Sequence, residues 1–267
     1  MKVQQIALCL SIIAFLACGC TEVEITPESK HEIVAYDKKT ISITGPLNLC
    51  INADSSNIEV YSQKKQEAIL EITKRIRGTK TQEELKKEMD YYNISIEESG
   101  NSIVIDSKFR GKIKNPTHYS ADFKIYIPKE VDSICLKLDT GKVTFYDDIN
   151  CVLLADIDTA NVTINRFDGR IEASFCKGDM RIASGKLERS SCIKTDIGNI
   201  SVKSEVDDNG EYTFQTGIGN IELFFNKESN IMVESIGNLE TNEFLQSSSG
   251  PMVKAYSNFG KINIRKY

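Results

Sequence analysis

The chain has 267 residues, of which 40% are hydrophobic and 27% are charged, and its formal net charge is -5 at pH 7. The basic residues are scattered along the sequence, which argues against a nucleic-acid partner, because phosphate binding needs a concentrated positive face. This length suits one large β domain or two smaller domains.

The first segment is an apolar run from Ile6 to Ala17 that follows Met1 and Lys2. It is too short and too close to the N-terminus for a membrane-spanning helix, so residues 1–20 are predicted to be a secretory signal peptide. An ordinary secreted protein or a buried N-terminal helix are the alternatives. No second apolar stretch of spanning length follows residue 20.

The end of this run resembles the lipobox of bacterial lipoproteins, in which small residues precede a cysteine that receives a diacylglycerol thioether. Ala17 and Gly19 occupy the third and first positions before Cys20, which is the expected lipid attachment site, and Cys18 is the alternative. Two or three acyl chains on one residue hold a protein stably on a membrane. The resemblance implies an extracytoplasmic protein of the bacterial cell envelope, with the membrane as its partner.

Residues 21–39 are expected to form a polar tether between the lipid and the fold. Beyond it, the charged segment from Gln82 to Asp90 predicts a short helical insertion near residues 80–91. Alternating apolar and polar residues predict strands around this helix, over residues 68–76, 92–98, 102–107 and 120–127. We expect this region to cover one end of the domain, because an open sheet edge promotes aggregation.

A short phrase then recurs: a small residue, then Asn, Lys or Asp, then an apolar, a polar and an apolar residue. The leading small residues are Gly141, Ala160, Gly178, Gly198, Gly219, Gly237 and Gly260, with an early copy at Ser56–Val60. Their spacing is close to twenty. Glycine permits positive φ, and the triplet has the two-residue period of a strand, so each copy predicts a turn that leads into a short strand.

A second column stands five residues before each leading residue, and all its members are apolar: Leu136, Ala155, Ala173, Ile193, Phe214, Met232 and Ala255. Stacked repeats need such a column, because each one buries only the face that its neighbours cover. The sequence therefore predicts an all-β, parallel, solenoid-like repeat over residues 131–267. Meandering antiparallel hairpins are the alternative, but they would reverse the chain every eight to twelve residues.

Five cysteines remain after the leader: Cys50, Cys135, Cys151, Cys176 and Cys192. Their spacing matches no zinc motif, and their number is odd. An exported protein could form a bridge. We expect free and mostly buried thiols, which behave as small hydrophobic groups.

The strand Ser120–Pro128, which ends in Ile-Pro, the segment Thr140–Val143 and the Gly-Asn repeats together resemble the bacterial "putative adhesin" domain. The resemblance covers residues 40–267, with N-terminal strands over 40–130 and repeats over 131–267. It implies a right-handed β-helix-like fold, an envelope location and no established enzymatic activity. The helix near residue 80 and the polar Thr241 in an inward position depart from a regular array.

Catalytic and metal-binding patterns are weak in this sequence. His31 falls in the expected tether and His118 in a turn-like segment, and no GxSxG motif accompanies them, although a site using His118 stays open. Four aspartates near the repeat turns match no calcium loop and are interpreted as turn formers: Asp139, Asp156, Asp158 and Asp196. Gly217-Ile218-Gly219 recurs in related forms and is interpreted as structural. No catalytic residue, metal or cofactor is predicted.

The outward positions of the triplets form a polar ladder: Thr144, Thr163, Arg181, Ser201, Glu222, Glu240 and Asn263. Such a face could bind a glycan or a protein, although a solvated sheet face is the simpler interpretation. The predicted function is a non-catalytic envelope lipoprotein that presents a surface for adhesion or for protein or glycan binding. Two alternatives are an envelope-stress or sensory accessory protein acting on a membrane partner and a carbohydrate-active enzyme on a β-helix.

Overall fold

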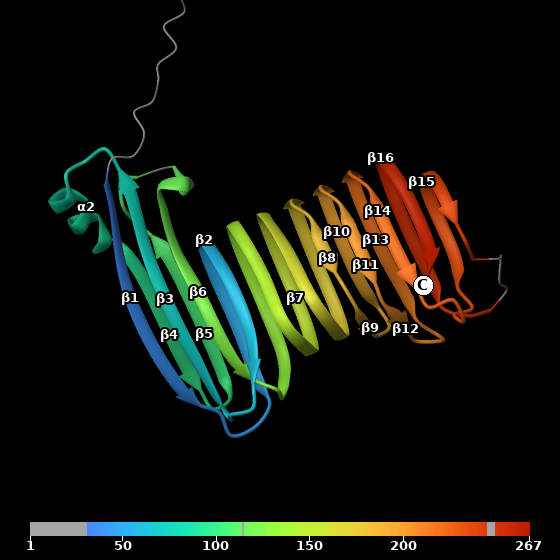
Figure 1. The fold of residues 1–267 in the computed structure, drawn as a ribbon, viewed down its shortest axis with the longest axis horizontal. Coiled ribbons are helices and arrows are strands. Elements are labelled where there is room, and N and C mark those ends of the chain that lie inside the picture. The colour runs from blue at the N-terminus through green and yellow to red at the C-terminus, as the bar shows by residue number, and fades with distance from the viewer. Residues whose placement is uncertain (1–30, 114, 245–248) are drawn as a thin grey trace, which may run out of the picture.

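The computed structural model describes residues 31–113, 115–244 and 249–267, so the expected signal peptide with Cys18 and Cys20 lies outside the described residues. Within them the chain is all β apart from one α-helix and one short 3-10 helix. The strands stand side by side in one long row, with the N-terminal strands at one end and the C-terminal strands at the other (Figure 1). No described helix is long and apolar enough to cross a membrane.

The repeat region begins with β7 (Val131–Lys177), which is 47 residues long. Shorter strands follow it: β8 (Met180–Ile182), β9 (Gly185–Leu187), β10 (Ser191–Ile197), β11 (Ile200–Lys203), β12 (Glu205–Val206), β13 (Glu211–Ile218) and β14 (Ile221–Phe225). Strand β10 pairs in parallel with both β7 and β13, and Ile193 lies in register with Ala173 and Phe214. Neighbours in space are thus about one sequence period apart, which excludes antiparallel hairpins here. The strands form a ring, but their lengths are uneven, so the array is not a regular solenoid.

Side chains in these strands alternate between the core and the outer face. Six members of the predicted inward column are buried: Leu136, Ala155, Ala173, Ile193, Phe214 and Ala255. They belong to one continuous hydrophobic core that runs from Ile41 to Ile264. The expectation for Met232 is wrong, because it pairs with Met252 and is half-buried, while Ser235 lies beside Ala255.

The leading glycine and the residue after it act at the turn of each repeat. Gly198 has a φ of 155°, and a Cβ atom there would overlap the carbonyl oxygen of Gly178 in the preceding repeat. Glycine is therefore required by both conformation and close approach. The next residues form a ladder, because Asp179 Oδ1 accepts the N–H of Asn199 at 2.7 Å and Asn199 Oδ1 accepts the N–H of Asn220 at 2.9 Å. The same bond joins the Asp179 N–H to Asn161 Oδ1 and the Lys261 N–H to Asn220 Oδ1, so the residue after the leading small residue links the repeats from Asn161 to Lys261.

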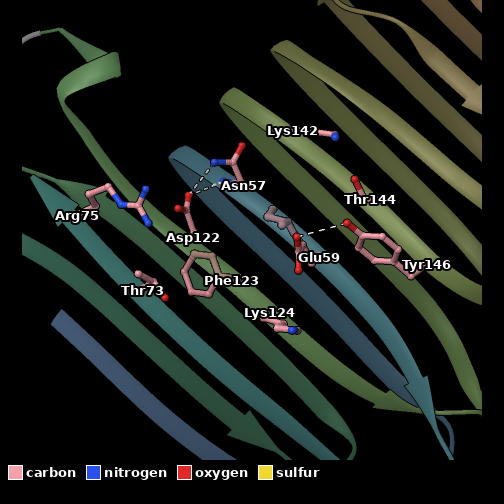
Figure 2. A pocket seen from close by; sticks show the side chains of 11 residues that line it. Asn57, Glu59, Thr73, Arg75, Asp122, Phe123, Lys124, Lys142, Thr144 and Tyr146 are labelled. Carbon is pink, nitrogen blue, oxygen red and sulfur yellow. Dashed lines mark hydrogen bonds between the residues drawn. The ribbon is translucent and has the colours of Figure 1, made fainter. Parts of the chain in front are cut away.

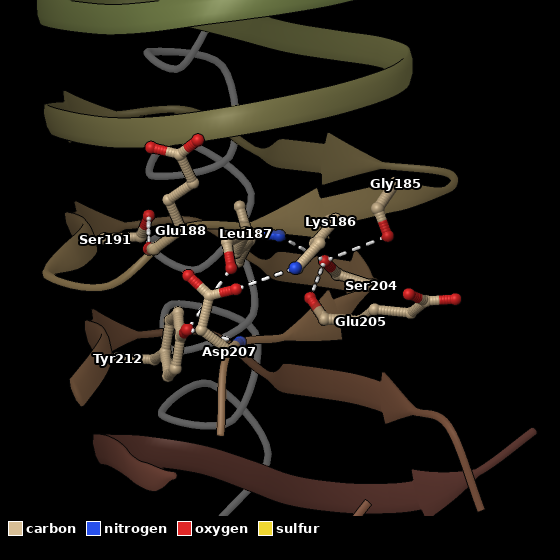
Figure 3. Close-up of polar contacts among 9 residues, drawn as sticks. All are labelled: Gly185, Lys186, Leu187, Glu188, Ser191, Ser204, Glu205, Asp207 and Tyr212. Carbon is tan, nitrogen blue, oxygen red and sulfur yellow. Dashed lines mark hydrogen bonds and ion pairs between the residues drawn. The ribbon is translucent and has the colours of Figure 1, made fainter. Parts of the chain in front are cut away.

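The stretch between β9 and β12 is held by side chains that reach buried backbone groups (Figure 3). These two strands pair over two residues each. The buried Ser204 hydroxyl accepts the N–H of Leu187 at 2.9 Å. The buried Tyr212 hydroxyl accepts the N–H of Asp207 at 2.8 Å and donates to the carbonyl of Leu187 at 3.2 Å. Hydroxyl groups thus satisfy backbone groups that a longer ladder would otherwise pair.

The N-terminal elements differ from the repeats in their pairing. They are β1 (His31–Ser42), β2 (Leu47–Gln63), β3 (Glu67–Gly78), α2 (Gln82–Met89), β4 (Tyr92–Ser99), β5 (Ser102–Phe109), η1 (Pro116–His118) and β6 (Tyr119–Pro128). Strand β2 carries the early copy of the phrase and pairs in parallel with β7, β5 and β6. Beyond it the pairing becomes antiparallel, with β6, β3 and β1 in one series and β5 and β4 in the other. The four predicted strands of this region are present.

Helix α2 confirms the predicted insertion near residues 80–91. Thr81 caps its N-terminus in a capping box with Glu84, and Leu85 is buried beneath it. The boundary of the expected tether is wrong, because residues 31–39, with His31, belong to β1. Residues 31–39 lie in register with Gly78 to Leu70 of β3, so this segment is part of the sheet.

The C-terminal strands leave the order of the sequence. Strand β16 (Met252–Lys266) pairs with β13 and β14 on one side and with β15 (Met232–Asn242) on the other. The last strand is thus inserted between its two predecessors. Pairing shifts register on both sides of Asn238 and Leu239, which agrees with the irregularity expected from Thr241. Asn263, expected to face outward, is only 6% exposed.

Candidate functional site

A groove of about 370 Å³ opens on the outer face where β3, β6, β2 and β7 lie side by side (Figure 2). Its polar and aromatic lining comprises Asn57, Glu59, Thr73, Arg75, Asp122, Lys124, Lys142, Thr144 and Tyr146. These residues come from four strands and from both sequence regions. The groove therefore lies at the junction between the N-terminal sheet and the first repeat.

Strand alternation and register position these side chains. Glu59 of β2 lies in register with Lys124 of β6 on one side and with Thr144 of β7 on the other. Asp122 of β6 lies in register with Thr73 of β3. Each of these residues occupies an outward position, since its neighbours in the strand, such as Ile58 and Phe123, are buried. Every second residue of each paired strand thus contributes a side chain to the floor of the groove.

Hydrogen bonds hold both carboxylates of the groove. Asp122 Oδ1 accepts the backbone N–H of Asn57 at 2.9 Å and its side-chain amide at 3.1 Å. The Glu59 carboxylate accepts the hydroxyls of Tyr61 at 3.0 Å and Tyr146 at 3.4 Å. Figure 2 shows the contacts of Asp122 with Asn57 and of Glu59 with Tyr146, with the Arg75 guanidinium on the Asp122 side of the groove. The carboxylates therefore have fixed orientations, which favours directional hydrogen bonding to a ligand.

Three tyrosines form a stack across β6, β2 and β7 beside this groove. The rings of Tyr126 and Tyr61 are 5.2 Å apart, and those of Tyr61 and Tyr146 are 4.7 Å apart with an interplanar angle of 7°. Lys124 Nζ lies 5.1 Å from the Tyr61 ring centroid. Burial raises the pKa of Tyr61, and its hydrogen bond to Glu59 raises it further. Tyr146 ends the stack on the β7 side and is 44% exposed.

Positive groups also border the groove. Arg75 lines the groove, and its Nε atom lies 3.3 Å from the Glu32 carboxylate of β1. Lys124 and Lys142 line the groove on the other strands. The lining therefore combines fixed acceptors, cationic donors, threonine hydroxyls and one exposed aromatic ring. These groups can hydrogen-bond to several hydroxyls of a ligand and pack against an apolar face.

The polar ladder expected from the repeats places one of its members, Thr144, in this groove. The next members continue the same face in register, from Thr163 to Arg181, Ser201 and Glu222. Sequence reasoning missed Thr73, Arg75, Asp122 and Lys124, which belong to β3 and β6. Their alternation with buried residues was visible, but their antiparallel pairing across more than forty residues was not.

The sequence candidates for catalysis lie elsewhere. Half-buried His118 lines a hollow of about 250 Å³ with Ser55 and Ser56. The Ser55 hydroxyl donates to the carbonyl of Tyr119 at 3.0 Å, and that of Ser56 donates to the carbonyl of Ala121. Both serine hydroxyls thus have structural roles in joining β2 to β6. The structure provides no argument for either as a nucleophile.

The aspartates near the repeat turns interact with one another. Burial and the Asp54 and Asp158 carboxylates raise the pKa of Asp139. Within the described residues, no group of three or more His, Cys, Asp or Glu side chains is arranged to hold a metal ion. The Asp54 and Asp158 carboxylates therefore oppose the ionisation of Asp139, and Lys108 favours it.

The five cysteines are less buried than expected. Cys151 is buried, Cys176 is exposed, and Cys50, Cys135 and Cys192 are half-buried. Cys135 and Cys192 line a shallow, mostly apolar hollow of about 550 Å³ on another part of the outer face. The expectation that most of these thiols are buried is therefore wrong.

An exposed apolar row crosses the repeat turns. Ile197, Ile218 and Phe259 lie in register on β10, β13 and β16, and they are 46%, 52% and 72% exposed. They occupy the positions just before the turn glycines Gly198, Gly219 and Gly260. Neighbouring apolar side chains in such a position are typical of a protein contact.

Comparisons with known proteins give similarity in solved structures alone. No family model matches the chain, and no curated protein matches it. A putative adhesin from Parabacteroides merdae aligns with a TM-score of 0.40 and 16% identity over 86% of this chain and 95% of that one. A putative lipid binding protein from Parabacteroides distasonis gives 0.38 and 14%, over 86% and 96%. A putative adhesin from Bacteroides fragilis gives 0.36 and 12%, over 90% and 99%.

Proposed function

We propose that this chain is a non-catalytic lipoprotein of the bacterial envelope that binds a glycan in the groove between β3, β6, β2 and β7. The strands would wind as a right-handed β-helix-like domain, and lipid on Cys20 would hold this domain outside the membrane. The observation that carries the proposal is the combination in one groove of fixed carboxylates, cationic donors and the exposed ring of Tyr146.

The chemistry of a sugar matches this combination. A pyranose presents several hydroxyls at its edge and apolar C–H groups on its face. Asp122, Thr144 and Lys142 can exchange hydrogen bonds with the hydroxyls, while the ring of Tyr146 can pack against the apolar face. The tyrosine stack behind Tyr146 fixes the ring, so little side-chain freedom is lost on binding.

The test is binding to an array of bacterial and host polysaccharides, followed by calorimetry with oligosaccharides from the strongest binder. Tyr146→Ala should raise the Kd about tenfold or more, which is about 1.4 kcal/mol. Tyr36→Ala, at an exposed tyrosine of β1, is the matched control and should bind as the parent does. A chain that binds no glycan at millimolar concentration, or a Tyr146→Ala variant with unchanged Kd, contradicts the proposal.

The same experiment separates binding from catalysis. A binding protein returns the oligosaccharide intact after long incubation. If products appear, and if Glu59→Gln or Asp122→Asn abolishes them, the chain is instead a carbohydrate-active enzyme that uses the groove carboxylates.

The anchor is tested in the producing cell. Cys20→Ala should release an unlipidated protein into the soluble fraction, whereas Cys18→Ala should leave it on the membrane. Membrane retention of Cys20→Ala would contradict lipid attachment at this residue.

A second candidate function, as an accessory protein for a membrane partner, is favoured by the exposed row of Ile197, Ile218 and Phe259. Cross-linking in intact envelopes with a photoreactive residue at position 218 would capture such a partner. Loss of the cross-linked product in Phe259→Ser, with glycan binding retained, would assign this row to a protein contact.

A further inference from the structure

Two cysteines from distant parts of the sequence lie in register on adjacent parallel strands. Cys50 of β2 pairs with Cys135 of β7, within a ladder that joins Leu49 to Ile134 and Ile51 to Leu136. These neighbours are buried, so both thiols lie on the outer face of the sheet. The strands between them in sequence, over residues 51–134, make up most of the N-terminal region.

We propose that Cys50 and Cys135 are a redox-active pair that forms a disulfide between the N-terminal sheet and the first repeat. Cα atoms of in-register neighbours on adjacent strands are about 4.8 Å apart, and a disulfide accepts Cα separations of about 4.4–6.8 Å. The Cβ atoms of such neighbours point the same way and are also about 4.8 Å apart, which is slightly longer than the 3.5–4.5 Å that a disulfide usually has. Bond formation therefore draws β2 and β7 slightly together, which makes the bond reducible.

The oxidant is a low-molecular-weight disulfide such as oxidised glutathione. One cysteine thiolate attacks this disulfide, forms a mixed disulfide and releases one glutathione thiolate. The second cysteine loses its proton and displaces the other glutathione, so two protein thiols are oxidised and one disulfide is reduced to two thiols. Cys135 lines the open hollow beside Leu154 and Cys192, which gives a small oxidant access to the pair.

The surroundings set the rate of this reaction. Burial raises the pKa of the Cys50 thiol to about 11, and the adjacent Cys135 thiol raises it as well. A protonated thiol is a poor nucleophile, so oxidation at neutral pH is slow and accelerates as the pH rises. Cys192 provides an internal comparison, because it lies in the same hollow and pairs in register with Glu172 rather than with a cysteine.

The experiment treats the purified full chain with oxidised glutathione at pH 8.5, alkylates the remaining thiols and maps the peptides by mass spectrometry without reduction. We expect a peptide linked through Cys50 and Cys135, with loss of two titratable thiols. The Tm of the oxidised chain should exceed that of the reduced chain by roughly 5–10 °C, because the bond closes a long loop. Dithiothreitol should reverse both changes.

Matched variants identify the pair. Cys50→Ser and Cys135→Ser should each abolish the linked peptide and the rise in Tm, and Cys192→Ser and Cys176→Ser should retain both. The peptide map of the unmodified chain gives the answer even if a serine variant folds poorly. Separate glutathione adducts on Cys50 and Cys135, two unreacted thiols, or a Cys135 to Cys192 link would each overturn the proposal.

Discussion

The repeats and the N-terminal strands share one hydrophobic core but differ in how their strands pair. In the repeats, each strand pairs in parallel with the strand about twenty residues away, and the same position performs the same task each time. In the N-terminal region, β1, β3 and β6 pair in antiparallel registers, and each turn has its own solution. A turn in the repeats therefore makes the same bonds as its neighbours, whereas a turn in the N-terminal region has its own contacts, such as those of the Thr44 and Gly45 N–H groups with Asn101 Oδ1.

This difference explains the position of the groove. A uniform ladder presents one short row of outward side chains per repeat, and that row changes little along the stack. At the junction, β3 and β6 add unrelated side chains to the same face, among them Arg75 and Lys124. The outward side chains are therefore most varied at the junction between the N-terminal sheet and the first repeat.

The largest expected effect comes from a charge in the inward ladder of the repeats. Ile200 is fully buried and lies between Met180 and Ile221 in register. Ile200→Asp should lower the free energy of unfolding by about 5 kcal/mol, because a carboxylate would be buried without a partner. Thermal unfolding followed by circular dichroism measures this loss.

A matched variant and hydrogen exchange test whether the effect of Ile200→Asp is confined to the repeats. Ser201→Asp, one residue along on the outer side, should change stability by less than about 0.5 kcal/mol. Hydrogen exchange in Ile200→Asp should accelerate first in β8, β11 and β14, with β3 and β6 retaining protection. Equal loss of protection in both regions would show that they unfold as one unit.

The next effect separates backbone conformation from close approach. Gly198→Ala should cost about 2–3 kcal/mol, because the position needs positive φ and the new Cβ would overlap the Gly178 carbonyl. Gly100→Ala, in the hairpin between β4 and β5, is the N-terminal counterpart. Its φ is 59°, and a Cβ there would meet no atom within 4 Å, so the cost should be about 1 kcal/mol. Equal losses in urea titrations would mean that the carbonyl contact adds nothing.

A smaller effect concerns the ladder of side-chain amides at the turns. Asn199→Ala removes the bond to the Asn220 N–H at 2.9 Å and the bond to Asp179 at 3.1 Å, and should cost about 1 kcal/mol. Lys142 stands at the ladder position between Asn57 and Asn161. Lys142→Asn should therefore stabilise the chain by about 0.5 kcal/mol in the same urea titration. A destabilised Lys142→Asn variant would show that the ladder does not extend into the first repeat.

The sequence predicted the strands and turns, which depend on short periodic patterns. It did not predict the order of the strands in the sheet. The alternation over residues 120–127 and the turn phrase at Gly198 are local signals, and the strands and parallel spacing followed from them. The exchange of β15 and β16 was not visible, because both carry the phrase. The reason lies in polarity: Val253, Ala255 and Ile262 of β16 are fully buried, whereas β15 exposes most of its residues at the edge. An apolar strand gains more from a place with neighbours on both sides.

The groove was missed for a related reason. Thr144 was predicted to face outward, but nothing in the sequence places Thr73 or Asp122 beside it, since antiparallel partners leave no constant spacing. The disulfide candidate is similar, because the register of Cys50 with Cys135 becomes visible only after β2 is paired with β7. A periodic pattern in the sequence therefore does not predict which strands pair when the two strands come from regions with different patterns.

The smallest expected effect lies where the two regions meet. Burial raises the pKa of Asp139 above its usual value, and the carboxylates of Asp54 of β2 and Asp158 of β7 raise it further. The folded state therefore holds this proton more tightly than the unfolded state does. Above the folded pKa the burial and repulsion of the Asp139 carboxylate destabilise the fold in full, and this penalty disappears as the pH falls below the unfolded pKa of about 3.9.

Asp139→Asn should therefore stabilise the chain slightly at pH 7, and this gain should vanish below about pH 4. Urea titrations at both pH values measure it, and Asp148→Asn, at an exposed aspartate of the same strand, is the control. A gain at pH 7 that survives at pH 3 would arise from packing rather than from charge. A loss at pH 7 would mean that the Asp139 carboxylate accepts a structural hydrogen bond, so that the junction is held by this group rather than strained by it.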